Sequence, residues 1–487
     1  MPLESLKKIL PIHKTKIVCT IGPASRSKTL LSQMIQQGMT IARLNFSHGT
    51  LEEHLNDIAC IRQLSDQYDQ LIPIMIDLPG AKIRIGQLKE EPITLKTGSK
   101  VTLTTENILG TKEIIPVDFH ELPQSVTVGN TIYLNDGFIE LKVNEIKEKE
   151  VHCSVIMGGQ LLSKKGVNLP GGQVRIDPIS QHDLEIVQLG LDQGINIFSV
   201  SFVEKKQDIV KVKEYAKKQG KNIFVIAKIE RDEAIQQFDD ILTVADAVMI
   251  ARGDLGMEIP IAKVPAIQKQ LIKKANQRGK PVITATQMLK SMTGNSRPTR
   301  AEVADVANAI YDGTDAIMLS EETAIGDYPV EAVKIMTEIA IASEKERNTT
   351  DFCKELREQI QQHQQTPTEV SDVISFTVNE AQQFLHPKYI LVTTASGNTA
   401  RRISRFKPKS WILAFSRNPE TCEFLPFSYG VYPFHMENPG KSWHELIIDF
   451  LKEHHLTKKD DIVLLTQRRF AKDKGGTDSL GVLVIDS

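Results

Sequence analysis

Eight short apolar runs, each rich in valine or isoleucine, recur along the first two thirds of the chain and constrain its fold more than any other feature. Near-continuous apolar strands are typical of parallel sheets that are covered on both faces. Stretches long enough for helices separate the runs, for example residues 207–219 and 263–279. Eight strand-and-helix units predict a (β/α)8 barrel, the TIM barrel. The runs begin at residues 15, 41, 72, 195, 222, 246, 280 and 315.

One interval between these runs is too long for a single helix. It lies between the third and fourth runs, where ITLKTGSKVTLTT and TIYLNDGFIELKV alternate apolar and polar residues. Such alternation predicts an antiparallel β domain, here a β-barrel-like lid inserted into the barrel. We therefore assign residues 1–81 and 177–345 to the barrel and residues 82–176 to the insert. Without the insert, the barrel segments approach the roughly 250 residues typical of this fold.

A third domain is expected after the polar, glutamine-rich segment at residues 356–369, which has the composition of a helix end and linker. Beyond it, the apolar runs KYILVTT, SWILAFS, DIVLLTQ and LGVLVID alternate with helical stretches. This alternation predicts a small α/β domain over residues 350–487.

The composition excludes several classes of partner. The chain has 59 basic and 61 acidic residues among 487, so charge gives it no reason to bind nucleic acid or a membrane surface. No apolar run approaches the length of a membrane span, and the first residues lack the apolar core of a signal peptide. Five scattered cysteines without a CxxC pair argue against disulfides and zinc, so we expect a cytoplasmic protein. They are Cys19, Cys60, Cys153, Cys353 and Cys422.

Polar side chains gather where the predicted barrel strands end. In this fold, the carboxyl ends of the strands form the rim that carries the active site. Any one of these residues could belong to an inward-facing layer of salt bridges, but the set as a whole favours an active site. The set comprises Arg43, Asn45, Ser47, Asp77, Lys228, Glu230, Asp254, Thr284 and Thr286.

Glu230 and Asp254 end neighbouring strands of this predicted barrel. Neighbouring strands lie about 4.7–4.9 Å apart, so both carboxylates can approach one cation, and Mg²⁺ prefers such a site. Lys228 points to the same side as Glu230 and would add positive charge beside an anionic ligand. The glycines of segment 252–256 would let backbone amides approach a phosphate or carboxylate, although a plain tight turn uses glycines as often.

Several stretches of the chain resemble the pyruvate kinase family. Together they cover the barrel and the insert almost end to end, whereas the third domain resembles the family's regulatory domain more loosely. The stretches are KTKIVCTIGPAS (14–25), ARLNFSHG (42–49), SKKGVNLPG (163–171), AKIE (227–230), ARGDLGMEIP (251–260), ATQML (285–289), RPTRAEVADVANAI (297–310) and ETAIGDYP (322–329).

The resemblance implies a glycolytic kinase that transfers the phosphoryl group of phosphoenolpyruvate to ADP and then protonates the enolate to pyruvate. By the same resemblance, Glu230 and Asp254 would hold Mg²⁺, and Lys228 would stabilise the transferring phosphoryl group. Gly253 with Asp254 would receive the substrate, and Thr286 would contact it and help to relay the proton. Arg43 would face the phosphates, and the nucleotide would lie near His48, Arg84 and Lys165.

The resemblance also bears on a monovalent cation. The family's K⁺ ligands match Asn45, Ser47, Asp77 and the carbonyl of Leu78, but Lys82 occupies the position of a glutamate in the K⁺-dependent members. A lysine can supply the positive charge itself, so we expect that K⁺ is not required. Two alternatives remain: the retained ligands could still form a cation site, and Lys82 could be a solvated residue at the lid hinge.

The segment 393–406 of the third domain predicts a strand, a turn and a basic helix. Its hydroxyls and free amides could bind a phosphate, or they could simply cap the helix. Its place in the family's regulatory domain favours a phosphorylated activator, a sugar phosphate or a nucleotide monophosphate, acting through a homotetramer. The residues concerned are Thr394, Ser396, Gly397, Asn398 and Thr399.

Two other functions are compatible with parts of this pattern. Another Mg²⁺-dependent enolate-forming barrel enzyme would share the two carboxylates but would not need a nucleotide lid. A catalytically inactive effector-binding homologue is the other alternative. The intact Lys228, Glu230, Asp254 and Thr286 speak against it.

Overall fold

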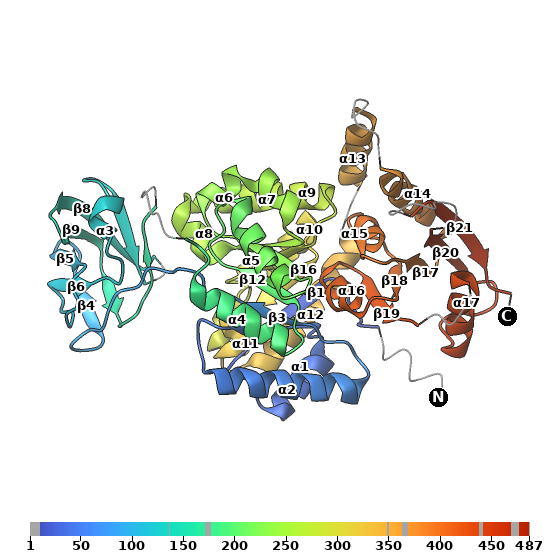
Figure 1. Cartoon of the computed structure of the whole chain (residues 1–487), viewed down its shortest axis with the longest axis horizontal. Coiled ribbons are helices and arrows are strands. Elements are labelled where there is room, and N and C mark those ends of the chain that lie inside the picture. The colour runs from blue at the N-terminus through green and yellow to red at the C-terminus, as the bar shows by residue number, and fades with distance from the viewer. Residues whose placement is uncertain are drawn as a thin grey trace.

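The computed structural model describes residues 10–135, 137–170, 177–347, 350–362, 369–437, 442–468 and 477–486. Three bodies follow one another along its long axis, with the barrel in the middle (Figure 1). Residues 171–176, at the end of the predicted insert, and residues 1–9, at the start of the predicted barrel segment, lie outside the described residues.

Eight parallel strands close into a barrel in the order β1-β16-β15-β14-β13-β12-β3-β2, which confirms the predicted fold. All their residues are buried except Asn45 at the end of β2, as expected for strands between a packed interior and a ring of helices. The strands are β1 (Lys16–Ile21), β2 (Ile41–Asn45), β3 (Ile74–Asp77), β12 (Ile197–Val200), β13 (Phe224–Ile229), β14 (Ala247–Ala251), β15 (Val282–Ala285) and β16 (Ala316–Leu319).

Amphipathic helices surround the barrel, and several begin at side-chain caps. Thr50 and Glu53 form a reciprocal capping box at α2, and Thr299 and Glu302 form one at α10. The longer helices are α1 (Lys28–Gln37), α2 (Leu51–Tyr68), α4 (Gln181–Asp192), α5 (Lys206–Lys218), α7 (Phe238–Val244), α9 (Val264–Gln277), α10 (Arg300–Asp312) and α12 (Pro329–Glu346). Three short helices, α6 (Asp232–Gln236), α8 (Arg252–Glu258) and α11 (Glu321–Ala324), follow β13, β14 and β16 at the rim.

The insert contains a six-stranded sheet in the order β11-β7-β8-β9-β5-β6 and a two-stranded sheet of β10 and β4. Its strand pairs are antiparallel except β5 with β6, which run parallel and depart from the expected pattern. The elements are β4 (Ile93–Leu95), β5 (Lys100–Thr104), β6 (Ile114–Pro116), α3 (Leu122–Ser125), β7 (Thr131–Leu134), β8 (Ile139–Ile146), β9 (Glu150–Met157), β10 (Gly159–Leu161) and β11 (Val167–Asn168).

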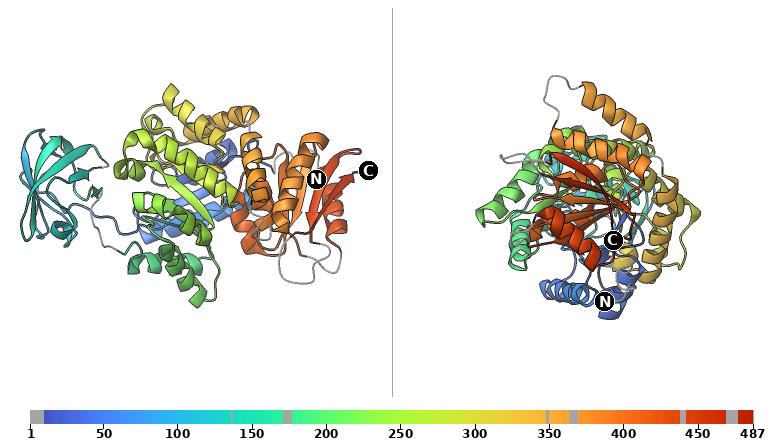
Figure 2. Two further views of the ribbon diagram at one scale, coloured as in Figure 1. Left: turned by 90° about the horizontal axis from the view of Figure 1, so that it is seen from above. Right: turned by 90° about the vertical axis from the view of Figure 1, so that its right-hand side faces the viewer.

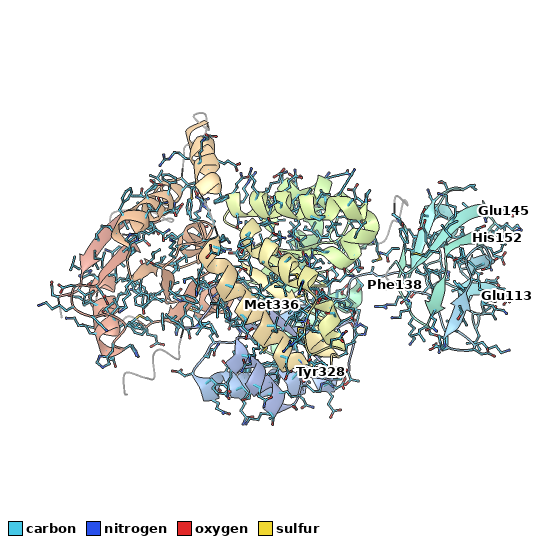
Figure 3. All side chains as sticks on the ribbon, turned by 180° about the vertical axis from the view of Figure 1, so that it is seen from behind. Glu113, Phe138, Glu145, His152, Tyr328 and Met336 are labelled. Atoms are coloured by element: carbon cyan, nitrogen blue, oxygen red, sulfur yellow. The ribbon has the colours of Figure 1, made fainter. Side chains whose placement is uncertain are left out.

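The chain that follows β3 leads from the barrel into the insert (Figure 2). Phe138 lies on the side of the insert that faces the barrel, whereas Glu113, Glu145 and His152 lie on the far side (Figure 3). The insert has its own apolar core, which includes Leu103, Leu141 and Val151. It therefore folds as a separate layer above the rim.

The third domain is a five-stranded sheet in the order β19-β18-β17-β20-β21, with β21 antiparallel to its neighbour. The edge strand β19 was not predicted, because Pro433 interrupts its pattern and proline is tolerated mainly in edge strands. The elements are α13 (Thr350–Gln362), α14 (Val370–Leu385), β17 (Tyr389–Thr393), α15 (Asn398–Ser404), β18 (Trp411–Ser416), α16 (Pro419–Phe424), β19 (Val431–His435), α17 (Trp443–Glu453), β20 (Ile462–Gln467) and β21 (Ser479–Val484).

The third domain packs against the amino-terminal end of the barrel, opposite the insert (Figure 1). Lys16 at the start of β1 donates to the carbonyl of Val431 at 2.8 Å, and Lys407 pairs with Asp315 at 2.6 Å. The carboxyl-terminal rim of the barrel is thus left to the insert. No helix in the described ranges is long and apolar enough to cross a membrane.

Candidate active site

Arg43 and Asp77 form a buried ion pair at the rim, because β2 and β3 are neighbours in the barrel. The Nε of Arg43 donates to Asp77 Oδ2 at 3.0 Å, and its Nη1 donates to Thr20 Oγ1 at 2.8 Å. Burial alone would raise the pKa of Asp77, but the charges of Arg43 and Lys228 hold it below its ordinary value. Asp77 is therefore an anion that organises the cations around it.

Lys228 reaches the same network from β13. Its Nζ lies 2.7 Å from Ser201 Oγ, 3.1 Å from Glu230 Oε1 and 3.4 Å from Asp77 Oδ1. Burial would lower the pKa of Lys228, yet the two carboxylates raise it above its ordinary value. A charged lysine in this surrounding can stabilise negative charge that develops on a ligand.

Glu230 follows Lys228 at the end of β13 and is almost fully buried. The backbone N–H of Phe202 donates to its Oε2 at 2.8 Å. Burial raises the pKa of Glu230, and the negative charge of Asp254 raises it further although Lys228 opposes the shift. Glu230 and Asp254 are therefore close enough for their negative charges to repel each other.

Asp254 does not lie in a loop, as its flanking glycines suggested, but in the first turn of helix α8. The amide of Gly253 donates to Thr286 Oγ1 at 2.7 Å, and Nζ of Lys82 lies 3.1 Å from Asp254 Oδ1. Thr286 has a positive φ of 67°, a strained conformation of the kind that clusters at functional sites. Arg252 supports this conformation by donating to the Thr286 carbonyl at 2.9 Å.

The carboxylates of Glu230 and Asp254 are suitable ligands for a magnesium ion. Mg²⁺ is held by one or two carboxylates together with water and substrate phosphate, so a larger cluster is not needed. The described residues contain no group of three or more His, Cys, Asp and Glu side chains that could hold a metal, which fits Mg²⁺ better than zinc. In this structure, each carboxylate has a lysine as its cationic partner.

Basic residues of the insert lie close enough to His48, which follows β2, to influence its charge. Desolvation lowers the pKa of His48, and the charges of Arg84, Arg43, Lys165 and Lys82 lower it further. The sequence-predicted nucleotide residues are thus brought together at one side of the rim. Such a group of cations suits a polyphosphate.

Three of the four predicted monovalent-cation ligands, Asn45, Asp77 and Leu78, accept hydrogen bonds within the chain. Asn45 Oδ1 accepts from the amide of Ser47 at 3.1 Å, and the Leu78 carbonyl accepts from Ser201 Oγ at 2.7 Å. Asp77 accepts from Arg43 and from Ser199. The ammonium of Lys82 contacts Asp254. It also lies 6.0 Å from the centroid of the Phe202 ring, which is about the longest distance for a cation–π contact.

The predicted effector residues lie at the start of α15. Gly397 has a φ of 74° and packs so closely that a Cβ would lie 2.9 Å from the Leu425 side chain, so glycine is required there. Its amide donates to Thr394 Oγ1 at 2.9 Å, and Thr399 Oγ1 lies 2.5 Å from Thr477 Oγ1. Ser396 is exposed and Asn398 opens the helix.

Three site residues on and just after β12 were missed from the sequence: Ser199, Ser201 and Phe202. The signal was present, since two serines two positions apart in an apolar run share one face of the strand. Conversely, Thr284 was expected at the rim but is fully buried, and it donates to Thr314 Oγ1 at 3.0 Å.

Comparisons with known proteins agree with this geometry. Residues 12–333 match the family described as "Pyruvate kinase, barrel domain", and residues 372–483 match "Pyruvate kinase, alpha/beta domain". A pyruvate kinase of Thermococcus litoralis is 49% identical over 477 residues, covering 98% of this chain and 99% of the relative. One from Staphylococcus aureus (strain MRSA252) is 44% identical over 424 residues, covering 87% of this chain and 72% of the relative.

A solved structure gives the same result. The crystal structure of a pyruvate kinase from Cryptosporidium parvum is 33% identical, has a TM-score of 0.88, and covers 99% of this chain and 97% of its own. The chain belongs to the pyruvate kinase family.

Proposed function

We propose that the rim residues transfer the phosphoryl group of phosphoenolpyruvate to ADP, giving pyruvate and ATP in glycolysis. The observation that carries this assignment is the position of Lys228. Its ammonium is buried among Asp77, Glu230 and Ser201, and the negative charge of Asp254 helps to raise its pKa.

Lys228 and Arg43 supply the fixed positive charge of the reaction. A loose phosphoryl transition state spreads negative charge over its oxygens and requires positioning more than covalent chemistry. Because both cations are held by buried partners, they need little reorganisation when that charge develops.

Glu230 and Asp254 would hold Mg²⁺, which when bound supplies positive charge at the substrate oxygens. Lys228 and Lys82 pair with these carboxylates here, and the ion would share the carboxylates with both ammonium groups, which stay beside the phosphates. Gly253 and Asp254 would receive the substrate at the start of α8, since the first N–H groups of a helix have no partner within the helix and can bind anions.

Thr286 is the proposed proton relay to the enolate. Its hydroxyl donates to the Ala285 carbonyl at 2.7 Å, so its hydrogen must rotate toward the substrate for the relay to operate. The amide of Gly253 can keep the oxygen in place during that rotation.

His48, Arg84 and Lys165 are proposed to bind the phosphates of the nucleotide. The insert, residues 82–176, would close over the barrel of residues 1–81 and 177–345 and exclude water, which competes with ADP for the phosphoryl group. Closure would move the insert relative to the rim, where Lys82 already contacts Asp254.

The third domain, residues 350–487, is proposed to bind a phosphorylated activator through Thr394, Ser396, Gly397, Asn398 and Thr399. Since Thr394 and Thr399 have internal partners, Ser396 and the first amides of α15 are the groups left to contact a phosphate. We further propose a homotetramer and a cytoplasmic location. In support of the latter, no disulfide joins the five cysteines, all of which lie in the described ranges.

A coupled assay tests the catalytic proposal. The purified chain is supplied with phosphoenolpyruvate, Mg²⁺ and ADP, and pyruvate is followed by its reduction with NADH and lactate dehydrogenase. We expect pyruvate to form only when ADP is present, with one ATP for each pyruvate. Pyruvate formation without ADP would favour the enolate-forming lyase, and no turnover at all would favour the inactive effector-binding protein.

A further inference from the structure

The turn after β12 contacts both charged residues that end β13. Ser201, which is 3% exposed, accepts a hydrogen bond from Lys228 Nζ at 2.7 Å and donates to the carbonyl of Leu78 at 2.7 Å. The next residue, Phe202, donates its backbone N–H to Glu230 Oε2 at 2.8 Å. Two consecutive residues thus hold the lysine and the carboxylate in place.

The direction of the Ser201 hydroxyl is fixed by this arrangement. A serine hydroxyl has one hydrogen, and the Leu78 carbonyl receives it. The oxygen therefore presents its lone pairs to Lys228 and acts only as an acceptor for the ammonium.

Ser201 also opposes the pull of the two carboxylates. Asp77 and Glu230 attract the ammonium of Lys228, but they lie 3.4 and 3.1 Å from Nζ, farther than Ser201 Oγ at 2.7 Å. Without the serine acceptor, we expect Nζ to move toward these carboxylates. It would then be misplaced for a phosphoryl group above it.

The backbone at this turn is strained, which indicates that its contacts are specific. Phe202 has a φ of 56°, uncommon for a residue with a bulky side chain. Its ring lies 5.4 Å from the Arg231 guanidinium, and its amide is used by Glu230. A Cβ on the neighbouring Gly80 would lie 3.0 Å from the Ser201 Cβ, so the backbone of Gly80 packs closely against this turn.

We propose that Ser201 is a positioning residue for phosphoryl transfer: it fixes the ammonium of Lys228 at the height of the transferring group and acts through that lysine. This inference rests on the proposed function. It gives the turn after β12 a role in the reaction, in addition to the strands that carry the charged residues.

Ser201→Ala tests the inference by separating kcat from KM. A displacement of about 1 Å in a catalytic group can cost about a hundredfold in rate, so we expect kcat to fall by about 10- to 100-fold. The KM values for phosphoenolpyruvate and ADP, and the affinity for Mn²⁺ measured by calorimetry, should stay within about twofold, because the Phe202 amide still holds Glu230.

Two further variants separate positioning from packing. Ser201→Cys keeps the shape of the side chain but offers a weak acceptor, so its kcat should also fall. Ser375→Ala removes another fully buried serine, in α14 of the third domain, and should leave kcat unchanged.

The outcomes distinguish this inference from the proposed function. If the wild type forms ATP and Ser201→Ala keeps its kcat, the positioning role is wrong. It is equally wrong if KM and Mn²⁺ affinity deteriorate together with kcat, since that result means the turn has collapsed. An inactive wild type would instead overturn the proposed function.

Discussion

Lys82 of the insert and Asp254 of the barrel face each other, with Nζ 3.1 Å from Oδ1, although they are 172 positions apart in the chain. The contact brings a cation from the lid connection to one of the two carboxylates at the rim. Because Glu230 and Asp254 repel each other, this neutralisation stabilises their proximity. The position of the insert is therefore linked to the charge of the active site.

Lys228→Ala should lower kcat by at least about a thousandfold, a loss in the range of other cations that contact a transferring phosphoryl group. The affinity for the metal should remain, because Lys228 competes with the metal ion for Glu230 and does not bind the ion itself. Initial rates and Mn²⁺ calorimetry measure the two properties. Lys274→Ala, which removes an exposed lysine paired with Asp239, is the control and should be near wild type. Near-normal turnover of Lys228→Ala would refute the assigned role.

Glu258→Gln should stabilise the metal-free protein at pH 8 but not at pH 5. Burial, with the charges of Glu233 and Asp254, raises the pKa of Glu258 to about 7 from an ordinary 4.5, although Arg231 opposes the shift. The folded state therefore binds more protons than the unfolded chain between these values. The contribution of Glu258 to the free energy of unfolding therefore falls as the pH rises from 4.5 to about 7.

Thermal unfolding at the two pH values measures this effect. The neutral amide keeps the side-chain shape, and we expect the midpoint of Glu258→Gln to exceed that of the wild type by about 2–4 °C at pH 8. Glu233→Gln removes a nearby exposed carboxylate and should show a smaller difference. An equal shift at pH 5 and pH 8 would show that the charge of Glu258 is not responsible.

Ser396→Asp should weaken binding of the phosphorylated activator. A carboxylate at this exposed position would repel a phosphate near the start of α15, and we expect at least a tenfold loss, about 1.4 kcal/mol. Calorimetry with ribose 5-phosphate and AMP provides the measurement. Ser396→Asn, which adds similar bulk without charge, is the control. Equal affinity in the wild type and Ser396→Asp would remove the site.

The sequence predicted the elements whose signal is local. Apolar runs such as 72–78 and 222–230 indicated the barrel strands, because strands buried on both faces are apolar along their whole length. Polar residues at the ends of those runs indicated the rim. Pro433 hid the edge strand β19, and the glycines beside Asp254 suggested a loop where α8 begins.

The remaining features depend on how distant segments meet. The Ser201 contact with Lys228 joins two neighbouring strands at a height that only the register defines. The Lys82 contact with Asp254 depends on where the insert lies relative to the rim. Neither distance is encoded in a local pattern, so the sequence could suggest the residues but not their pairing.

The wild type is expected to be substantially active without K⁺. Lys82 is not a freely solvated residue of the lid hinge: its side chain is 21% exposed and its ammonium contacts Asp254. A fixed cation at this distance, in a partly dry site, can replace a monovalent ion beside the substrate phosphates. Three of the four groups that match the family's K⁺ ligands, namely Asn45, Asp77 and the Leu78 carbonyl, meanwhile accept hydrogen bonds within the chain.

Lys82→Glu should therefore convert the enzyme to K⁺ dependence, because it places a second carboxylate beside Asp254. Initial rates are measured with Mg²⁺ and tetramethylammonium chloride, and then with KCl at the same ionic strength. The wild type should keep at least about half of its rate without K⁺, whereas Lys82→Glu should gain about tenfold or more when KCl is added. Lys82→Met, which is neutral, controls for the loss of the side chain and should lie between them. A wild type that is nearly inactive until K⁺ arrives would show that Lys82 does not replace the ion.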